Sequence, residues 1–192
     1  KYNLNNMIKR LSAFDFDGTL MNSPEKETGK VEWQEKMGKP YPFEGWWGRP
    51  ESLDLSVFDI KPFPVVLHQL EREKSYTDGY VIVLTSRQEK LRPYVQAVLD
   101  KNNIQVDKLD MKHGWMNKGQ KILKYIQEFP ELTEINVYDD MDEHINAYQE
   151  IKNQIPEHIT LNIYYSDQGK LTLIESNSKL FNIITEEIQK II

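Results

Sequence analysis

The 192-residue chain contains no cysteine, which excludes disulfide bonds, thiolate metal sites and a cysteine nucleophile. This fits a reducing compartment, and we expect a cytoplasmic protein. No apolar run approaches the roughly 18 residues that a membrane helix needs, and no signal peptide is visible, so no membrane partner is expected. Basic residues are outnumbered, 24 Lys and Arg against 30 Asp and Glu, which gives a net charge of −6. That charge argues against a broadly basic nucleic-acid surface but not against a local basic cleft.

The remaining composition is that of an ordinary globular protein. Apolar residues make up 39% of the chain and charged residues 28%, so the chain is expected to fold. Its length suits one α/β domain, residues 1–192, and is too short for two. The chain begins at Lys1 rather than at a methionine, which leaves two interpretations, a native start at Met7 or a piece of a longer protein.

One short segment carries most of the chemical information. In Phe14–Leu20, FDFDGTL, two carboxylates stand two residues apart after a short apolar segment. Side chains in a strand alternate faces, so Asp15 and Asp17 point the same way and can spread apart past the strand end. One can then attack a phosphorus while the other protonates the leaving oxygen. Gly18 allows a sharp turn that Thr19 can hydrogen-bond, so the segment is predicted to be a catalytic loop, with an acidic surface turn as the alternative.

The hydrophobic patterns predict strands that alternate with helices. Strands are expected at residues 8–16, 80–84, 104–111 and 134–138. Helices are expected at residues 64–74, 117–129 and 142–152, and a further helix follows residues 85–87 and runs to about residue 102. This alternation predicts an α/β fold with a doubly wound, mostly parallel, Rossmann-like sheet, whose ligand site lies beyond the carboxyl ends of its strands. Residues 159–165 and 171–175 flank a hairpin turn and precede an amphipathic helix that runs to Ile192.

Residues 22–61 do not follow this pattern. They are rich in Gly, Pro, Glu and Trp, have no clean period and contain Gly45–Pro50, GWWGRP. Because flexible linkers do not contain three tryptophans, we expect an ordered insertion that forms a small cap over the end of the first strand.

Polar side chains follow three of the predicted strands, and a lysine opens a helix between two of them. They are Asp15 and Asp17, then Thr85 to Arg87, then Lys118 on the helix, then Asp139 with Asp140. Carboxylates without a His or Cys cluster make an oxygen-only site, which selects Mg²⁺. The cation would offset the repulsion between an attacking carboxylate and a phosphate, while a Lys and a hydroxyl hold the other oxygens. The set therefore predicts phosphoryl transfer.

Several of these residues also have a plainer interpretation. The alternatives are helix capping for Asp139 and Asp140, an ordinary strand end for Thr85 and a solvated helix start for Arg87. Lys112 and Lys121 compete with Lys118 by position, although Asn117 can cap a helix that begins at Lys118. His144 is assigned to a supporting or surface position rather than to catalysis.

Four motifs in this chain resemble those of the haloacid dehalogenase (HAD) phosphatase superfamily. DFDGTL, an apolar strand ending in Thr85, a helical Lys118 and VYDD occur in the family's order over residues 8–148. The resemblance implies that Asp15 is the nucleophile, forming an aspartyl-phosphate, and that Asp17 is the general acid and then the base. It implies that Thr85 and Lys118 hold the phosphate and the nucleophile. The implied Mg²⁺ ligands are Asp15, Asp17 through its backbone carbonyl, Asp139 and Asp140, with Asp140 in direct coordination.

A finer resemblance concerns one part of this superfamily. The spacing of Thr85 and Arg87 is similar to the S/T-G-R element of polynucleotide kinase-phosphatases, whose Arg helps to bind phosphate, with Ser86 in place of the usual Gly. An early NSP tripeptide, the GWWxxP insertion and His144 resemble the "Swiss Army Knife" RNA-repair-like HAD branch. Met141 stands where that branch usually has Arg. The implied activity is removal of phosphate from RNA or nucleotide ends.

The insertion suggests how a substrate would be held. In HAD proteins such an insertion arches over the nucleophile, so at least one of Trp33, Trp46 and Trp47 is a candidate to stack on a base. Packing of these rings against the body of the domain is the alternative. Arg49, Lys90 and Arg92 form either a cationic rim of the site or an ordinary solvated face. The other predicted substrate contacts are Gly18, Ser86 and Arg87.

Together these features predict a Mg²⁺-dependent phosphomonoesterase that removes the terminal phosphate of a nucleic-acid end or a nucleotide. A small cap leaves the site open, which suits a polymeric substrate better than a metabolite. One rival is a nucleotidase or sugar-phosphate phosphatase, and another is a non-catalytic HAD-fold binding module. A further interpretation makes the chain a domain or partner of a larger RNA or DNA repair system.

Overall fold

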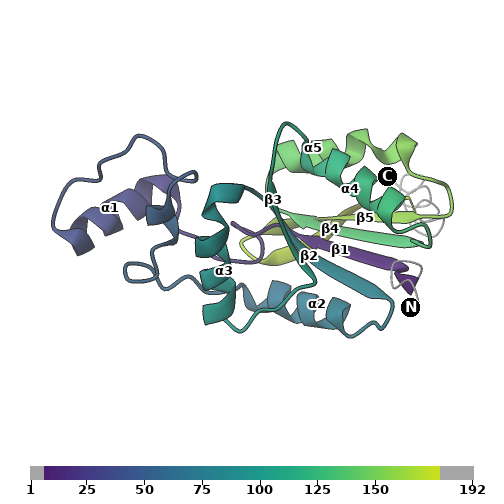
Figure 1. Cartoon of the computed structure of the whole chain (residues 1–192), viewed down its shortest axis with the longest axis horizontal. Coiled ribbons are helices and arrows are strands. Elements are labelled where there is room, and N and C mark those ends of the chain that lie inside the picture. The colour runs from purple at the N-terminus through teal and green to yellow at the C-terminus, as the bar shows by residue number, and fades with distance from the viewer. Residues whose placement is uncertain (1–6, 178–192) are drawn as a thin grey trace, which may run out of the picture.

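The computed structural model describes residues 7–177 and shows a three-layer α/β fold (Figure 1). A six-stranded sheet in the order β3-β2-β1-β4-β5-β6 forms the middle layer. The strands are β1 (Arg10–Phe14), β2 (Gly79–Gln88), β3 (Lys108–Lys112), β4 (Glu134–Asp139), β5 (Thr160–Asp167) and β6 (Lys170–Ser176). All neighbours are parallel except β5 and β6. The predicted mostly parallel, doubly wound sheet is confirmed.

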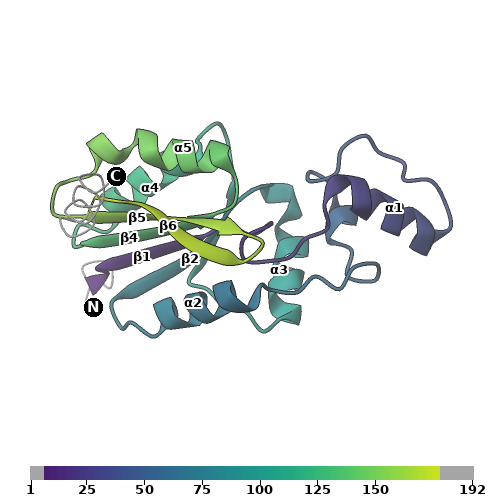
Figure 2. The same ribbon diagram turned by 180° about the vertical axis from the view of Figure 1, so that it is seen from behind.

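Helices cover both faces of the sheet (Figures 1 and 2). Helices α2 (Pro64–Lys74) and α3 (Arg92–Lys101) lie on one face, and α4 (Lys118–Glu128) and α5 (Asp142–Glu150) on the other. Alternate residues of the central strands enter two separate cores, so Phe14 and Val83 pack on the α2 side while Ala13 and Ile82 pack on the α4 side. Burial on both faces explains the continuous apolar runs of these strands. No helix within residues 7–177 is long and apolar enough to cross a membrane.

The ends of several elements differ from those predicted. β1 ends at Phe14, two residues early, and β2 continues through Thr85–Arg87 because it pairs with β3 again after a bulge. Helix α4 begins where predicted, since Asn117 accepts from the Gln120 backbone N–H and the Gln120 side chain accepts in return. Three short 3₁₀ helices, η2 (Pro50–Leu53), η3 (Glu89–Leu91) and η4 (Lys152–Gln154), complete the described elements. The predicted helix up to Ile192 lies outside the described residues.

Residues 22–61 form an ordered insertion beyond the carboxyl ends of the strands (Figure 1). It contains a helix, α1 (Lys26–Met37), which the sequence pattern did not reveal. Only Gly29 and Trp33 of this helix are buried, so no apolar stripe marks it. Trp46 is only 2% exposed, packs against neighbouring aromatic rings and donates its indole N–H to the Pro24 carbonyl at 2.8 Å. Its ring forms the centre of the insertion's own core.

Candidate active site

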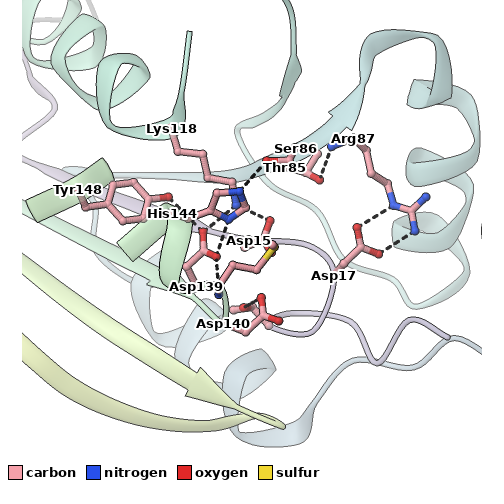
Figure 3. Close-up of polar contacts among 12 residues, drawn as sticks. Asp15, Asp17, Thr85, Ser86, Arg87, Lys118, Asp139, Asp140, His144 and Tyr148 are labelled. Atoms are coloured by element: carbon pink, nitrogen blue, oxygen red, sulfur yellow. Dashed lines mark hydrogen bonds and ion pairs between the residues drawn. The ribbon is translucent and has the colours of Figure 1, made fainter. Parts of the chain in front are cut away.

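The register of three strands brings the predicted site residues to one edge of the sheet. Phe14 of β1 lies level with Val83 of β2 and Tyr138 of β4, so the residues that follow them meet at the carboxyl edge. Asp15 follows β1, Thr85 to Arg87 end β2, and Asp139 ends β4. Figure 3 shows these side chains converging with Lys118, which arrives from the start of α4.

A buried lysine joins the first and last of these strand ends. The Lys118 ammonium lies 2.6 Å from Asp15 Oδ1 and 2.7 Å from Asp139 Oδ2 (Figure 3). The two competing lysines are placed elsewhere. Lys121 Nζ binds Asp110 at 2.5 Å and the Met111 carbonyl at 2.7 Å, and Lys112 is exposed at the end of β3. The geometry therefore favours Lys118 as the lysine that contacts Asp15.

Asp139 is fully buried and its carboxylate is saturated with hydrogen bonds. Oδ1 accepts from the Met141 backbone N–H at 3.2 Å and lies 2.8 Å from His144 Nδ1. Oδ2 accepts from Lys118 and, at 3.3 Å, from the Tyr148 hydroxyl. A carboxylate offers about four acceptor positions, and all are used here. Asp139 therefore anchors its neighbours, and a metal ion would have to displace one of these donors.

His144 extends this arrangement towards the end of β2. Its Nε2 lies 2.9 Å from Ser86 Oγ, and a neutral ring with the proton on Nδ1 satisfies both the carboxylate and the hydroxyl. The sequence suggested a supporting or surface position for His144, whereas its side chain lines the cleft. Tyr148 was not singled out at all, although it lies one helical turn after His144 and thus on the same face of α5. We call Asp15, Lys118, Asp139, His144 and Ser86 the sheet-side network.

Asp17 belongs to a different set of contacts. Figure 3 shows its carboxylate turned away from Asp15 towards Arg87, whose Nε and Nη2 lie 2.7 and 2.9 Å from the two carboxylate oxygens. Nη1 of Arg87 also donates to the Trp47 carbonyl at 3.0 Å and to Ser52 Oγ at 2.8 Å. Arg87 was predicted to contact a phosphate; its buried guanidinium joins Asp17 to the insertion, and Arg87 also lines the cleft. We call Asp17, Arg87, Trp47 and Ser52 the insertion-side clamp.

The charges of the site are unbalanced. Burial raises the pKa of Asp15 well above its ordinary value, with added repulsion from Asp139 and Asp17, and Lys118 only partly opposes this. Burial and the charge of Asp139 also raise the pKa of Asp140. Burial of Asp139 is outweighed by Lys118 and His144, so the pKa of that carboxyl is lowered. Within the described part of the site, the carboxylates carry more negative charge than Lys118 and Arg87 neutralise.

The donor set fits a hard divalent cation. Asp15, Asp17 and Asp140 line the same cleft and offer oxygen ligands. Among residues 7–177 the side-chain donor to Asp140 is the Thr19 hydroxyl, which lies 3.2 Å from Oδ1, so this carboxylate keeps free acceptor positions. Asp15, Asp139 and His144 also offer atoms within 4.8 Å of one another, but Asp139 and His144 are already bonded to each other. Asp15 and Asp140 are therefore the better-placed side-chain ligands.

The site residues open into a cleft of about 500 Å³ between the sheet edge and the insertion. Its lining includes Gly18, Ser86, Arg87 and Trp47, whose ring is 37% exposed. Gly18 has φ +72°, and a Cβ there would clash with the Asp140 carboxylate, so this position requires glycine. Two predicted substrate contacts lie elsewhere. They are Trp46, which is buried in the insertion, and Arg49, whose guanidinium lies 4.2 Å from the Phe43 ring centre.

No protein-family model matches the chain, and no curated protein matches it. Solved structures match its fold. The HAD-like hydrolase SP0104 from Streptococcus pneumoniae gives a TM-score of 0.52 at 15% identity, over 75% of this chain and 81% of that chain. The HAD domain of the effector protein Lem4 from Legionella pneumophila gives 0.51 at 17% identity, over 93% of both chains.

A chain of the Pnkp1/Rnl/Hen1 complex also matches, with a TM-score of 0.51 at 15% identity over 85% of the present chain. The present chain spans 47% of that one, about half of its length. At these identities the comparisons establish the architecture. The chain has the fold of HAD-like hydrolases, as the order of its four motifs predicts.

Proposed function

We propose that this protein is a Mg²⁺-dependent phosphomonoesterase that works through an aspartyl-phosphate on Asp15. One observation carries the proposal: Asp15 lies at the base of an open cleft, and Lys118 holds only its Oδ1. Oδ2 has no hydrogen-bond partner among the described residues, which leaves it to attack phosphorus. An exposed acidic turn, the plainer alternative, would have neither this burial nor this lysine.

Each remaining residue has a defined task in the proposed reaction. Lys118 keeps Asp15 Oδ1 in place, so that Oδ2 faces the phosphorus in line with the leaving oxygen. The Thr85 hydroxyl and the Ser86 backbone N–H, from two residues that line the cleft, would hold phosphoryl oxygens. Asp17 protonates the leaving oxygen and then deprotonates the water that hydrolyses the aspartyl-phosphate. For this its carboxylate must turn from Arg87 towards Asp15.

Asp15, Asp140 and the Asp17 backbone carbonyl would hold Mg²⁺. When bound, the cation would offset the negative charge of the nucleophile and the phosphate. Burial, with added repulsion from neighbouring carboxylates, raises the pKa values of Asp15 and Asp140, and a bound cation would oppose both effects, which supports this assignment.

The proposed substrate is a phosphorylated nucleic-acid end or nucleotide. Trp47 lines the cleft and is 37% exposed, whereas Trp33 and Trp46 are buried, so Trp47 is the tryptophan of the insertion that would stack on a base. The insertion lines one part of the cleft and is small, and a site that it leaves accessible to solvent would suit a polymer. The chain also shares its fold with a chain of the Pnkp1/Rnl/Hen1 complex, and the proposal includes a place in a larger RNA or DNA repair system.

A panel of phosphate-release assays tests this function. We expect Mg²⁺-dependent release from p-nitrophenyl phosphate and higher kcat/KM on 3′- or 5′-phosphorylated oligonucleotides than on mononucleotides or hexose phosphates. EDTA should abolish release and Mg²⁺ should restore it. Asp15→Asn should abolish turnover while leaving the thermal unfolding temperature nearly unchanged. No release from any aryl phosphate would favour a non-catalytic binding module, and preference for small metabolites would favour the nucleotidase or sugar-phosphatase alternative.

A further inference from the structure

The charge on the rim of the cleft is uneven. The exposed Glu25 and Glu143 line the cleft from the insertion and from α5, which follows β4, and the exposed Lys112 lines it from the end of β3, the edge strand on the other side of β1 and β2. A phosphodiester chain that continues from a bound terminal phosphate is repelled by the first side and attracted by the second. The uneven charge therefore favours a path along the β3 edge for the nucleotide chain that leaves the cleft.

A second hollow of about 290 Å³ adjoins the cleft in that direction. It is lined by Gln88, Glu89, Lys90, Lys112, His113 and Gly114, and it shares Gln88 and Lys112 with the cleft. Arg92 binds both carboxylate oxygens of Glu89, which offsets the negative charge of this lining residue. Lys90 and Lys112 form no ion pair with any residue in the range 7–177, so both ammonium groups are available to an anion.

An exposed tryptophan follows the wall of this hollow. Trp115 comes directly after Gly114 in the loop between β3 and α4, and 83% of it is exposed. Gly114 has φ +68°, so the loop turns sharply just before the ring. Trp46, by comparison, is only 2% exposed because it lies in the core of the insertion. An exposed ring one residue beyond a hollow that is lined by two lysines without ion pairs has the composition of a single-strand binding platform, cationic groups for the backbone and a flat face for a base.

We infer that the second hollow, with Lys90, Lys112 and Trp115, binds the nucleotides adjacent to the terminal phosphate of a single-stranded polynucleotide. This inference rests on the proposed function and narrows its substrate class. A base stacks on Trp115 while the lysines contact the backbone phosphates. The strand is single because the bases of a duplex are already stacked and paired, so their faces are not offered to an isolated ring.

Binding to the Asp15→Asn protein tests the inference without turnover. The probes are phosphorylated oligonucleotides of one, two, four and eight nucleotides, measured by fluorescence anisotropy with Mg²⁺ present. We expect affinity to rise with length up to about four nucleotides. Trp115→Ala should weaken binding of the four-nucleotide probe roughly tenfold, and Trp115→Phe should keep most of it, because base stacking needs an aromatic face. The matched control is Tyr94→Ala, which removes an exposed ring of α3 outside both hollows and should change nothing.

The lysines are tested through salt dependence. Replacing Lys90 and Lys112 together by Ala should lower the slope of log affinity against log salt by about 1.4, the value for two contacts to a single strand. Lys36→Ala, on α1 and outside both hollows, should leave the slope unchanged. A duplex of the same length, with a blunt phosphorylated end, should bind no better than a mononucleotide.

The outcomes separate this inference from the proposed function. Turnover of p-nitrophenyl phosphate tests the function alone, because that substrate has no strand to fill the second hollow. Affinity that does not change with length, or Trp115→Ala with unchanged binding, would overturn the inference even in an active phosphatase. Equal binding of an acidic peptide of the same charge would also overturn it, since the hollow would then select charge without bases. Length-dependent, Trp115-dependent binding would support it even if the aryl phosphate were not hydrolysed.

Discussion

The two carboxylates of the FDFDGTL loop are neighbours in sequence and belong to different regions of the site. Asp15 lies in the sheet-side network, whose members come from β1, β2, β4, α4 and α5, so that the packing of the whole domain holds it in place. Asp17 lies in the insertion-side clamp, which depends on one guanidinium and a loop of the insertion. A fixed position favours attack by a nucleophile, the proposed role of Asp15. A general acid and base, the proposed role of Asp17, must be able to dissociate from its ion-pair partner in order to transfer a proton.

Of the changes that compare the two regions, removal of the Asp17 carboxylate from the insertion-side clamp should lower turnover most. Asp17→Asn removes the proposed proton donor, and we expect turnover of alkyl phosphates to fall by about 10²–10⁴. The loss on p-nitrophenyl phosphate should be much smaller, because nitrophenolate leaves without a proton. Steady-state kinetics on both substrates measure the difference. Ser52→Ala is the matched control, since it removes one hydrogen bond of Arg87 and leaves Asp17 intact. An equal loss on both substrates would contradict the assignment of Asp17 as general acid.

The sheet-side network should lose both stability and activity when Lys118, its buried lysine, is removed. Lys118→Ala leaves the carboxylates of Asp15 and Asp139 buried without their shared partner, so we expect a loss of about 3–5 kcal/mol in the free energy of unfolding and of about 10²–10³ in kcat. Denaturant unfolding and phosphate release measure the two losses.

Lys121 provides the control for Lys118. It is also buried and also pairs with a carboxylate, Asp110, but outside the cleft. Lys121→Ala should therefore lower stability without a comparable loss of kcat. If both variants lost turnover in proportion to stability, Lys118 would be a structural residue only.

The sequence and the structure agree best where local pattern and chemistry coincide. The apolar run before Thr85, the Asn117 cap and the hairpin turn at Gln168 and Gly169, both with positive φ, each specify their element locally, and all were predicted. Helix α1 was missed because only two of its residues face a core. Local pattern is therefore a good guide to the sheet and a poor one to the insertion.

The candidate site shows the same limit. The spacing of the motifs places Asp15, Lys118 and Asp139 at one edge, because parallel strands end together. The Asp17–Arg87 ion pair joins residues 70 positions apart through the conformation of the insertion, which no local pattern encodes. For the same reason the sequence alone could not separate the buried Trp46 from the half-exposed Trp47 beside it.

The smallest effect, and the sharpest test of the sheet-side network, concerns His144. We expect His144→Ala to lower kcat about ten- to a hundredfold with little change in KM, because Asp139 loses one of its donors and Lys118 is then held less firmly. Ser86→Ala removes only the contact at Nε2 and should cost less. If His144 acts by fixing Asp139 through a ring that Ser86 orients, the double variant should be no worse than His144→Ala alone. Additive losses would show instead that the histidine and the serine act separately, and the network would then end at Asp139.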